Sequence, residues 1–369
     1  MKIGIYTLPF TWNYGGVLQA YALQAVLEGC GHEVVIIDRR KNAGCARNML
    51  KRIKWEAIAL ASKLSICRKH PLVAVESFKR QYLNRSPLFF YANDLRRYCK
   101  RERIQALIVG SDQIWRYEAA QDIGNSFGDF VGDAVLKIAY AVSFGGDDWT
   151  YPNAATKWCR ELLCGFKAVG LREASGVEMC LKYFWPLPTK NGMLPKLVID
   201  PVLLAGRDVF LPLVSKIADA SGAKGFIFSY MLDGCNEKEL IVKTVAETLD
   251  CGAVGYMDHG VSPSMERWLS CIARSRFVVT DSFHGMCFSI LFNKPFIAIG
   301  NIKRGMARFI SLVNILGLND RLMLLSGISK NTISDVLQKD ICWQDVNSRI
   351  EKLRSESMLF IMNALSEKP

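Results

Sequence analysis

The stretch RFVVTDSFHGMCFSILFNKPFIAIG, at residues 276–300, decides the fold of this chain. Its β-branched and aromatic residues 277–279 predict a short buried strand. The apolar residues that follow have the spacing of one helix face and fall at positions 283, 286, 287, 290 and 291. Asn293-Lys294-Pro295 ends this helix, and residues 296–299 form a second apolar strand. The stretch therefore predicts a βαβ unit of an α/β fold.

Three polar residues gather where this helix begins. Asp281 or Ser282 can cap the helix, and His284 lies in its first turn. In open α/β sheets this turn lies outside the carboxyl end of a strand, where free N–H groups and the helix dipole favour an anion. His284 is therefore a candidate for proton transfer or anion binding, because imidazole exchanges its proton near neutral pH. The alternative is a core or capping histidine without a chemical role.

Other predicted strands end in the same way. Residues 106–110 form a buried strand followed by Ser111, Asp112 and Gln113, and residues 138–142 form another that is followed by Ser143. Polar residues at the carboxyl end of a parallel strand favour a site. Asp112 can orient or deprotonate a hydroxyl group, although it can also be only a helix cap.

Arg172 follows a further predicted strand at residues 166–170. Its guanidinium can bind a carboxylate or phosphate through two parallel hydrogen bonds, a geometry that lysine does not reproduce. The alternative is a surface ion pair with Glu173 or Glu178.

The first strand is expected at residues 3–7 and the first helix at residues 16–27. Asn13-Tyr14-Gly15-Gly16 fills the turn between them, and two glycines would let the backbone approach a phosphate. The pair does not match the dinucleotide fingerprint, so a site-lining loop and a purely structural turn both remain open.

A chain of 369 residues is too long for one typical core. Strands alternate with helices on both sides of an irregular, proline-rich connection before residue 196. We therefore expect an α/β protein of two doubly wound, Rossmann-like domains facing a cleft. The predicted parts are an N-terminal domain at residues 1–195, a C-terminal domain with the candidate site around His284 at 196–330, and helices at 331–369 that pack back across both.

The net charge of +12 is concentrated in one region. Residues 39–103 hold eighteen Lys and Arg against four acidic residues, a local charge of +14. Within them, residues 49–67 mix basic and apolar side chains as interfacial helices do, which suits an anionic membrane surface or a pyrophosphate-bearing acceptor. The alternative is an ordinary solvated helix face. No helix-turn-helix, zinc-finger or RNA-binding signature is present, so nucleic acid is not expected as a partner.

The chain is expected to be cytoplasmic. Peripheral attachment to the inner face of the cytoplasmic membrane is a further possibility that the basic region raises. Residues 1–6 lead directly into a strand rather than a signal peptide, and no apolar run has the length of a spanning helix. The twelve cysteines contain no CxxC pair, so reduced thiols are expected and neither zinc nor a disulfide framework is indicated.

Several segments resemble the polysaccharide pyruvyl transferase family. They are NYGGVLQAYALQ at 13–24, VGSDQIW at 109–115, AYAVSFG at 139–145, LREASG at 171–176, IDPVLL at 199–204 and RGMARF at 304–309. Together with the HG and KPF of residues 276–300, they follow the family's order over about nine tenths of the chain. The resemblance implies transfer of pyruvate from phosphoenolpyruvate to two hydroxyls of a sugar, on a fold similar to the two-domain GT-B architecture.

The resemblance also suggests roles for the candidate residues. His284, oriented by Asp281, and Asp112 are the expected catalytic residues. The expected donor-binding residues are Arg172, Ser282, Gly285, Arg304 and Arg308. The expected acceptor-side loop residues are Asn13, Tyr14, Gly15, Gly16, Ser111, Gln113 and Ser143. Some relatives carry an arginine where this chain has Ser282, so Arg304 or Arg308 is expected to replace that donor contact. No metal or other cofactor is expected beside the phosphoenolpyruvate donor.

Two other functions remain open at this point. One is a nucleotide-sugar glycosyltransferase with the same architecture, and the other is an inactive relative that binds saccharide. The sequence does not identify the acceptor sugar, although the basic region favours one linked to a lipid in the synthesis of a bacterial capsule, exopolysaccharide or cell-wall glycan.

Overall fold

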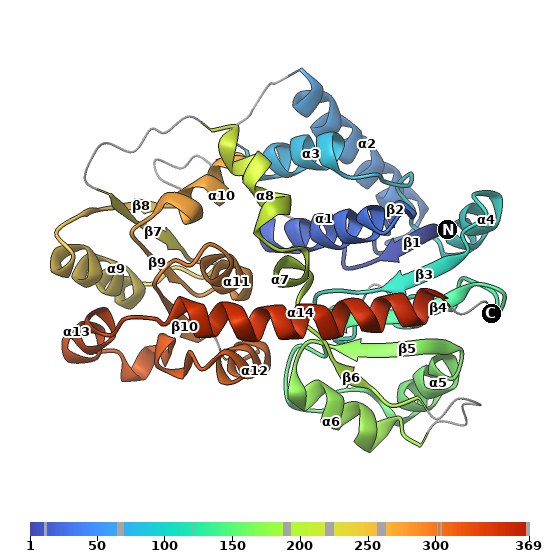
Figure 1. Ribbon diagram of the computed structural model, residues 1–369. Coiled ribbons are helices and arrows are strands. Elements are labelled where there is room, and N and C mark those ends of the chain that lie inside the picture. The colour runs from blue at the N-terminus through green and yellow to red at the C-terminus, as the bar shows by residue number, and fades with distance from the viewer. Residues whose placement is uncertain are drawn as a thin grey trace.

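The computed structural model describes residues 1–10, 13–64, 70–120, 122–186, 193–217, 225–256, 263–300, 302 and 305–366. Two parallel sheets lie side by side, each with helices around it (Figure 1). The predicted α/β class with two doubly wound domains is confirmed.

The first sheet has six strands in the order β2-β1-β3-β4-β5-β6. The strands are β1 (Lys2–Tyr6), β2 (Glu33–Ile37), β3 (Ala106–Val109), β4 (Leu136–Val142), β5 (Phe166–Leu171) and β6 (Lys196–Leu197). The helices of this half are α1 (Tyr14–Gly29), α2 (Cys45–Lys63), α3 (Pro71–Tyr82), α4 (Ala92–Arg101), α5 (Asn153–Leu163) and α6 (Ala174–Tyr183). The chain reverses its direction across the sheet between β1 and β3, and such a switch point is where open α/β sheets bind ligands.

The second sheet has five strands in the order β11-β10-β9-β7-β8, with its own switch point between β7 and β9. The strands are β7 (Phe226–Tyr230), β8 (Gly252–Gly255), β9 (Phe277–Thr280), β10 (Phe296–Gly300) and β11 (Leu322–Leu324). The helices are α7 (Pro201–Ala205), α8 (Arg207–Ser215), α9 (Asn236–Thr248), α10 (Met265–Arg274), α11 (Phe283–Leu291), α12 (Ala307–Leu316), α13 (Lys330–Gln338) and α14 (Trp343–Ser366).

The predicted βαβ unit is β9, α11 and β10, in which Val278 pairs with Phe296 in parallel register. Residues 283–290 of α11 are all buried, which explains why its sequence is apolar on nearly every side. Helix α11 lies against α7 and α1, so it forms part of the contact between the two halves.

Two predicted boundaries differ from the structure. Strand β6 pairs with β5 through Gly170 and Lys196, so the first sheet extends past the predicted domain end at residue 195. Helix α1 begins at Tyr14, so Gly15 and Gly16 are helical rather than part of a turn. Glycine is a poor helix former, which is why the sequence pattern predicted that the first helix would begin at residue 16 rather than at residue 14.

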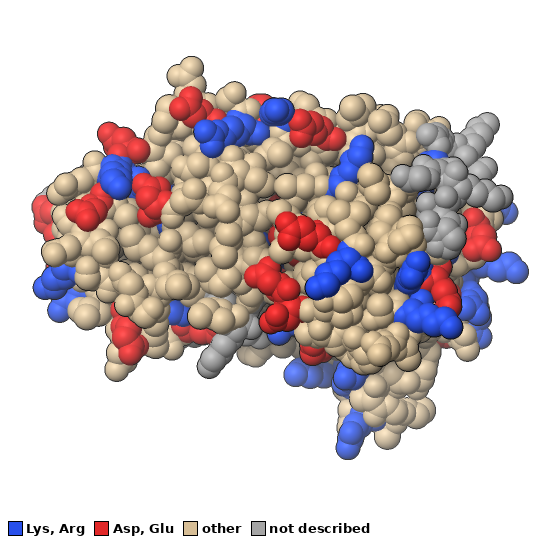
Figure 2. All heavy atoms as spheres, turned by 90° about the horizontal axis from the view of Figure 1, so that it is seen from below, with Lys and Arg blue, Asp and Glu red and all other residues tan. Residues whose placement is uncertain are grey.

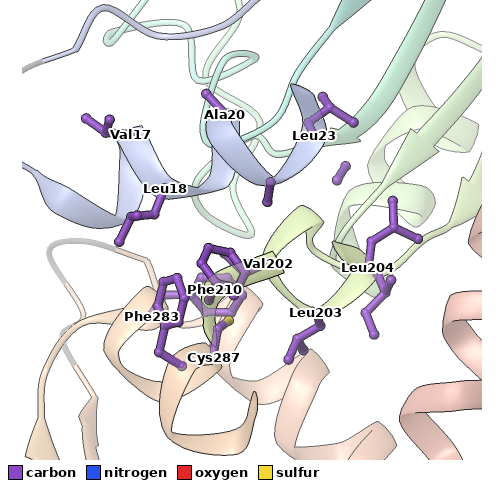
Figure 3. Close-up of a cluster of buried hydrophobic side chains, with 14 of the residues drawn as sticks. Val17, Leu18, Ala20, Leu23, Val202, Leu203, Leu204, Phe210, Phe283 and Cys287 are labelled. Carbon is purple, nitrogen blue, oxygen red and sulfur yellow. The ribbon is translucent and has the colours of Figure 1, made fainter. Parts of the chain in front are cut away.

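One apolar cluster joins the halves. It contains Val17 and Leu18 of α1, Val202 of α7, and Phe283 and Cys287 of α11. Leu18 points from α1 toward Phe283 and Val202 (Figure 3). Helix α14 adds a second connection, because it crosses the molecule and contacts α7, α12, β4 and β5 (Figure 1). Helix α13 instead packs on α9 of the second half. A shared apolar core of this kind fixes the relative position of two domains more firmly than a polar contact would.

Candidate functional site

A cavity of about 290 Å³ lies between the two switch points. Its walls come from the loops after β1 and β3 in the first half and after β7 and β9 in the second half, with the start of α12. Polar residues that line it include Asn13, Gln19, Asp112, Gln113, His284 and Arg308. The carboxyl ends of both sheets therefore converge on one small polar cavity.

Ser282 is the residue that caps α11, because its Oγ accepts a hydrogen bond from the Gly285 N–H at 3.3 Å. Asp281 does not orient His284, and this expectation is wrong. Its carboxylate accepts hydrogen bonds from the backbone N–H groups of Leu232 (2.6 Å) and Asp233 (3.1 Å) and pairs with Lys238 Nζ at 2.6 Å. Asp281 and Ser282 both line the cavity, and Asp281 holds the loop between β7 and α9 in place at its wall.

His284 is buried in the contact between α11 and α1, with 3% of its surface exposed. Gly15 makes this position available, since a Cβ atom added there would lie 2.4 Å from His284 Cβ. The Nε2 atom of His284 lies 3.7 Å from Asp200 Oδ2. Burial lowers the pKa of His284, although Asp200 and Asp112 oppose the effect. Neutral imidazole, which can accept a proton, is therefore the main form near pH 7.

Arg172 joins two carboxylates that come from distant parts of the chain. Its Nη2 atom lies 3.0 Å from Asp112 Oδ1, and its Nη1 atom lies 3.0 Å from Asp200 Oδ2. The side chain is 1% exposed and does not line the interdomain cavity. Burial would lower the pKa of Arg172, but Asp112 and Asp200 raise it above its usual value. Arg172 thus positions carboxylates within the protein. Its Nε atom also lies 3.9 Å from Glu173 Oε2, so the alternative ion pair with Glu173 is present but buried rather than at the surface. Donor binding by Arg172 stays a prediction.

Asp112 lines the cavity, as does Asp281. Burial alone would raise the pKa of Asp112, but the neighbouring Arg172, His284 and Arg308 hold it at about 2. Asp112 is therefore ionised at neutral pH. It would be a poor general base, because an effective general base has a pKa near the working pH. Its carboxylate is better suited to accept a hydrogen bond from a hydroxyl than to remove its proton.

Arg308 is the cation on the cavity wall, with Nη1 3.7 Å from Asp112 Oδ1. Its guanidinium and that of Arg172 lie 5.2 and 5.0 Å from the centroid of the Phe283 ring. Burial and the positive charge of Arg172 lower the pKa of Arg308 to about 10, against the opposing effect of Asp112. Arg308 remains protonated at neutral pH, and an anionic ligand would stabilise this charge further.

The remaining predicted residues fall into two groups. Asn13, Gly16 and Gln113 line the cavity. The others lie behind its wall: the Ser111 hydroxyl donates to Gln19 Oε1, Ser143 Oγ accepts from the Gly145 N–H, and the Tyr14 hydroxyl donates to the Pro263 carbonyl. A Cβ on Gly285 would lie 2.4 Å from Thr280 Oγ1, so Gly285 allows α11 to pack closely on β9. Arg304 lies outside the described residues.

Three residues at the site were not predicted from the sequence. Asp200 binds Arg172 and lies beside His284, Phe283 lies beside both arginines, and Gln19 lines the cavity. Asp200 gave a usable signal, because it follows an apolar segment as Asp112 does and precedes a proline that begins a helix. Phe283 and Gln19 lie at ordinary helix positions, so nothing in the sequence marked them as site residues.

Among the described residues, no group of three or more His, Cys, Asp and Glu side chains has a geometry that could hold a metal ion. None of the described helices combines the length and the apolar character needed to cross a membrane.

Solved structures of low sequence identity share this fold. UDP-N-acetylglucosamine 2-epimerase from Rickettsia bellii has a TM-score of 0.54 at 8% identity, over 98% of this chain and 96% of its own. The S. aureus MnaA structure with UDP has a TM-score of 0.53 at 11% identity, over 100% and 98%. UDP-GlcNAc 2-epimerase from Neisseria meningitidis, bound to UDP-GlcNAc, has a TM-score of 0.52 at 10% identity, over 99% and 100%.

The two facing α/β domains define a protein of the GT-B architecture, with its polar cavity between the domains. A sequence model described as polysaccharide pyruvyl transferase matches residues 13–303, and the chain belongs to that family. It is accordingly a transferase. No curated protein gives a significant sequence match to the chain.

Proposed function

We propose that the protein transfers pyruvate from phosphoenolpyruvate to two hydroxyls of one sugar, forming a cyclic ketal. The observation that carries this proposal is that Arg308, buried and neutral His284, and ionised Asp112 all line one small cavity. A volume of about 290 Å³ lies at the lower end of ligand cavities and suits a three-carbon phosphate better than a whole nucleotide sugar.

The reaction requires a proton donor, a proton acceptor and a cation for the departing phosphate. Two C–O bonds form to the central carbon of the donor, and its C–O bond to phosphate breaks. One hydroxyl proton ends on the enol carbon, which becomes a methyl group, and the other leaves with phosphate. The proposed chemistry uses no metal.

Each role has a candidate among the residues that line the cavity. His284 carries the proton between hydroxyl and enol carbon, since its neutral ring accepts a proton and its protonated ring donates one. Arg308 holds the phosphate or carboxylate of the donor through charge-assisted hydrogen bonds. Asp112 orients the sugar hydroxyl, and Arg172 holds Asp112 and Asp200 in position.

A membrane-bound acceptor is supported by the surface of α2. Its apolar residues Met49, Leu50, Ile53 and Leu60, and Leu64 directly after it, are each more than half exposed and lie within about 100° of one another at helical spacing. Lys51 and Lys54 flank this apolar stripe on one side, and Arg52 and Lys63 flank it on the other. We propose that α2 contacts an anionic membrane surface and that the acceptor sugar is lipid-linked.

The charge on another face of the molecule is consistent with this orientation. The lower face in Figure 1, seen directly in Figure 2, mixes acidic and basic side chains without a large patch of one sign. Helix α2 lies at the opposite, upper edge of Figure 1. The lower face thus offers no large basic patch of its own that would compete with the side carrying α2 for anionic lipid.

A thermal-shift titration tests the donor. Phosphoenolpyruvate is expected to raise the melting temperature, while UDP and CMP leave it unchanged, because only a ligand of the folded state stabilises it. Stabilisation by a nucleotide alone would instead support the second candidate, a nucleotide-sugar glycosyltransferase. If a saccharide binds but neither phosphoenolpyruvate nor a nucleotide stabilises the protein, the protein would instead be an inactive relative that binds saccharide.

A further inference from the structure

A second and larger cavity, of about 890 Å³, lies within the first half of the molecule. It is enclosed by the segment after β2 and by helices α2, α3 and α4, which together form the basic region of the sequence. None of the residues discussed for the interdomain cavity lines it. This second cavity is therefore a separate candidate for ligand binding.

Five charged side chains form the floor of the second cavity. Lys79 Nζ and Arg85 Nη2 each lie 2.7 Å from a Glu76 carboxylate oxygen, and Arg40 Nε lies 3.2 Å from Asp38 Oδ1. Three cations thus face two carboxylates. Lys79 is 1% exposed, and burial lowers its pKa even though Asp38 and Glu76 oppose the effect. A buried group with one excess positive charge is stabilised when an anion binds beside it.

The walls and rim above this floor add aromatic and cationic groups. Trp55, Phe89 and Tyr98 supply aromatic surface. Arg52, Arg97 and Arg101 lie at the rim with two acidic residues, Glu56 and Asp94. Among the described residues, Arg52 has no ion-pair partner and is exposed. Arginines around an anion with aromatic surface beside it are typical of sites for phosphate on a larger organic body.

Phe10 separates the two cavities. It lines the interdomain cavity, its carbonyl accepts a hydrogen bond from Arg40 Nη1 at 2.6 Å, and its ring lies 5.5 Å from Lys79 Nζ. Strands β1 and β2 are neighbours in the sheet, so their carboxyl ends open on the same edge. A ligand held on the charged floor would therefore lie close to Phe10, which lines the interdomain cavity.

We infer that the second cavity binds a phosphate or pyrophosphate group carried by the acceptor, while the acceptor's sugar reaches past Phe10 to His284. This inference rests on the proposed function. Most of the floor is buried, but the Arg85 side chain is 22% exposed and presents its charge to a cavity about three times as large as the interdomain cavity.

Isothermal titration with inorganic pyrophosphate tests the inference. Arg52→Gln and, separately, Arg85→Gln are expected to weaken binding about 10- to 100-fold, as for the loss of one charged hydrogen-bond donor. Arg52 is exposed, so its variant remains informative if Arg85→Gln unfolds. Lys243→Gln, which removes an exposed cation from α9, is the matched control and should bind as the wild type does.

A parallel titration of Arg308→Gln separates the two cavities. Loss of pyrophosphate binding in Arg308→Gln with full binding in Arg52→Gln would overturn the inference, because the anion would then occupy the interdomain cavity. Farnesyl pyrophosphate and UDP as competing probes distinguish a lipid carrier from a nucleotide carrier. Titration of the wild type with phosphoenolpyruvate separates the claims: donor binding without pyrophosphate binding overturns only this inference, and absence of donor binding contradicts the proposed function.

Discussion

His284 and Gly15 depend on each other although 268 positions separate them in the chain. The imidazole occupies space that only a glycine leaves open on the facing helix. Sequence reasoning identified both residues, but it placed Gly15 in a turn before the first helix, which it left open as a site-lining loop or a structural turn. A contact between two helices from different domains has no signature in the sequence of either one, because local spacing predicts only which face is apolar.

Replacing His284 by alanine is expected to lower turnover about 10²- to 10⁴-fold, the range for loss of one general acid or base. Since the pKa of His284 is lowered, turnover of the wild type should fall only when the pH drops below about 6.5, the usual value for histidine. A steady-state pH profile measures both effects. His32→Ala, which changes a histidine away from the site, is the control, and full turnover in His284→Ala would exclude the proposed role.

Gly15→Ala is expected to reduce turnover by about 10²-fold, because a misplacement of about 1 Å at a reacting group has that effect. The added Cβ would lie 2.5 Å from His284 Nδ1, so the ring or the helix must shift. Gly29→Ala is the matched control in the same helix, since no atom lies within 4 Å of its added Cβ. Equal rate constants for the two variants would show that the close approach has no functional consequence.

At the scale of elements, three segments meet at Arg172. The guanidinium follows β5 and binds Asp112 after β3 and Asp200 before α7. The strands and the polar residues at their carboxyl ends were predictable from apolar runs followed by loops. The pairing among those polar residues was not predictable. An arginine can bind a carboxylate on another loop or an external anion, and the sequence does not show which of the two it binds.

Arg172→Met should destabilise the fold by about 3–5 kcal/mol, since removing one partner leaves buried carboxylates without their counter-charge. Urea unfolding followed by circular dichroism measures the free energy of unfolding. Arg97→Met removes an arginine whose side chain is 79% exposed, and it should change that free energy by less than about 1 kcal/mol. A loss in Arg172→Met no larger than in Arg97→Met would show that the network contributes little.

At the scale of the whole molecule, the two sheets have the same kind of strand order, each with one switch point. The interdomain cavity lies between the two switch points. The alternation of strands and helices predicted this architecture. The second cavity was not predictable, because its walls come from four elements whose packing the charge pattern alone does not describe. The basic composition indicated an anionic partner for residues 39–103, but it did not indicate that these residues form a cavity.

The proposed orientation at a membrane predicts sedimentation of the protein with phosphatidylglycerol vesicles but not with phosphatidylcholine vesicles. Ile53→Asp combined with Leu60→Asp should weaken this binding about 10-fold or more, because two apolar side chains leave the interface. Leu359→Asp alters an equally exposed leucine on α14 and should have no effect. Equal binding of the double variant would contradict a role for α2.

The most direct test of pyruvyl transfer is turnover with phosphoenolpyruvate and a panel of sugars that are nucleotide-linked or polyprenyl-pyrophosphate-linked. Phosphate release and product mass are measured together. The expected result is release of phosphate with an acceptor that gains the mass of one pyruvate less one water, and loss of both signals in His284→Ala. Release of a nucleoside diphosphate from a nucleotide sugar, with no phosphate from phosphoenolpyruvate, would contradict the account.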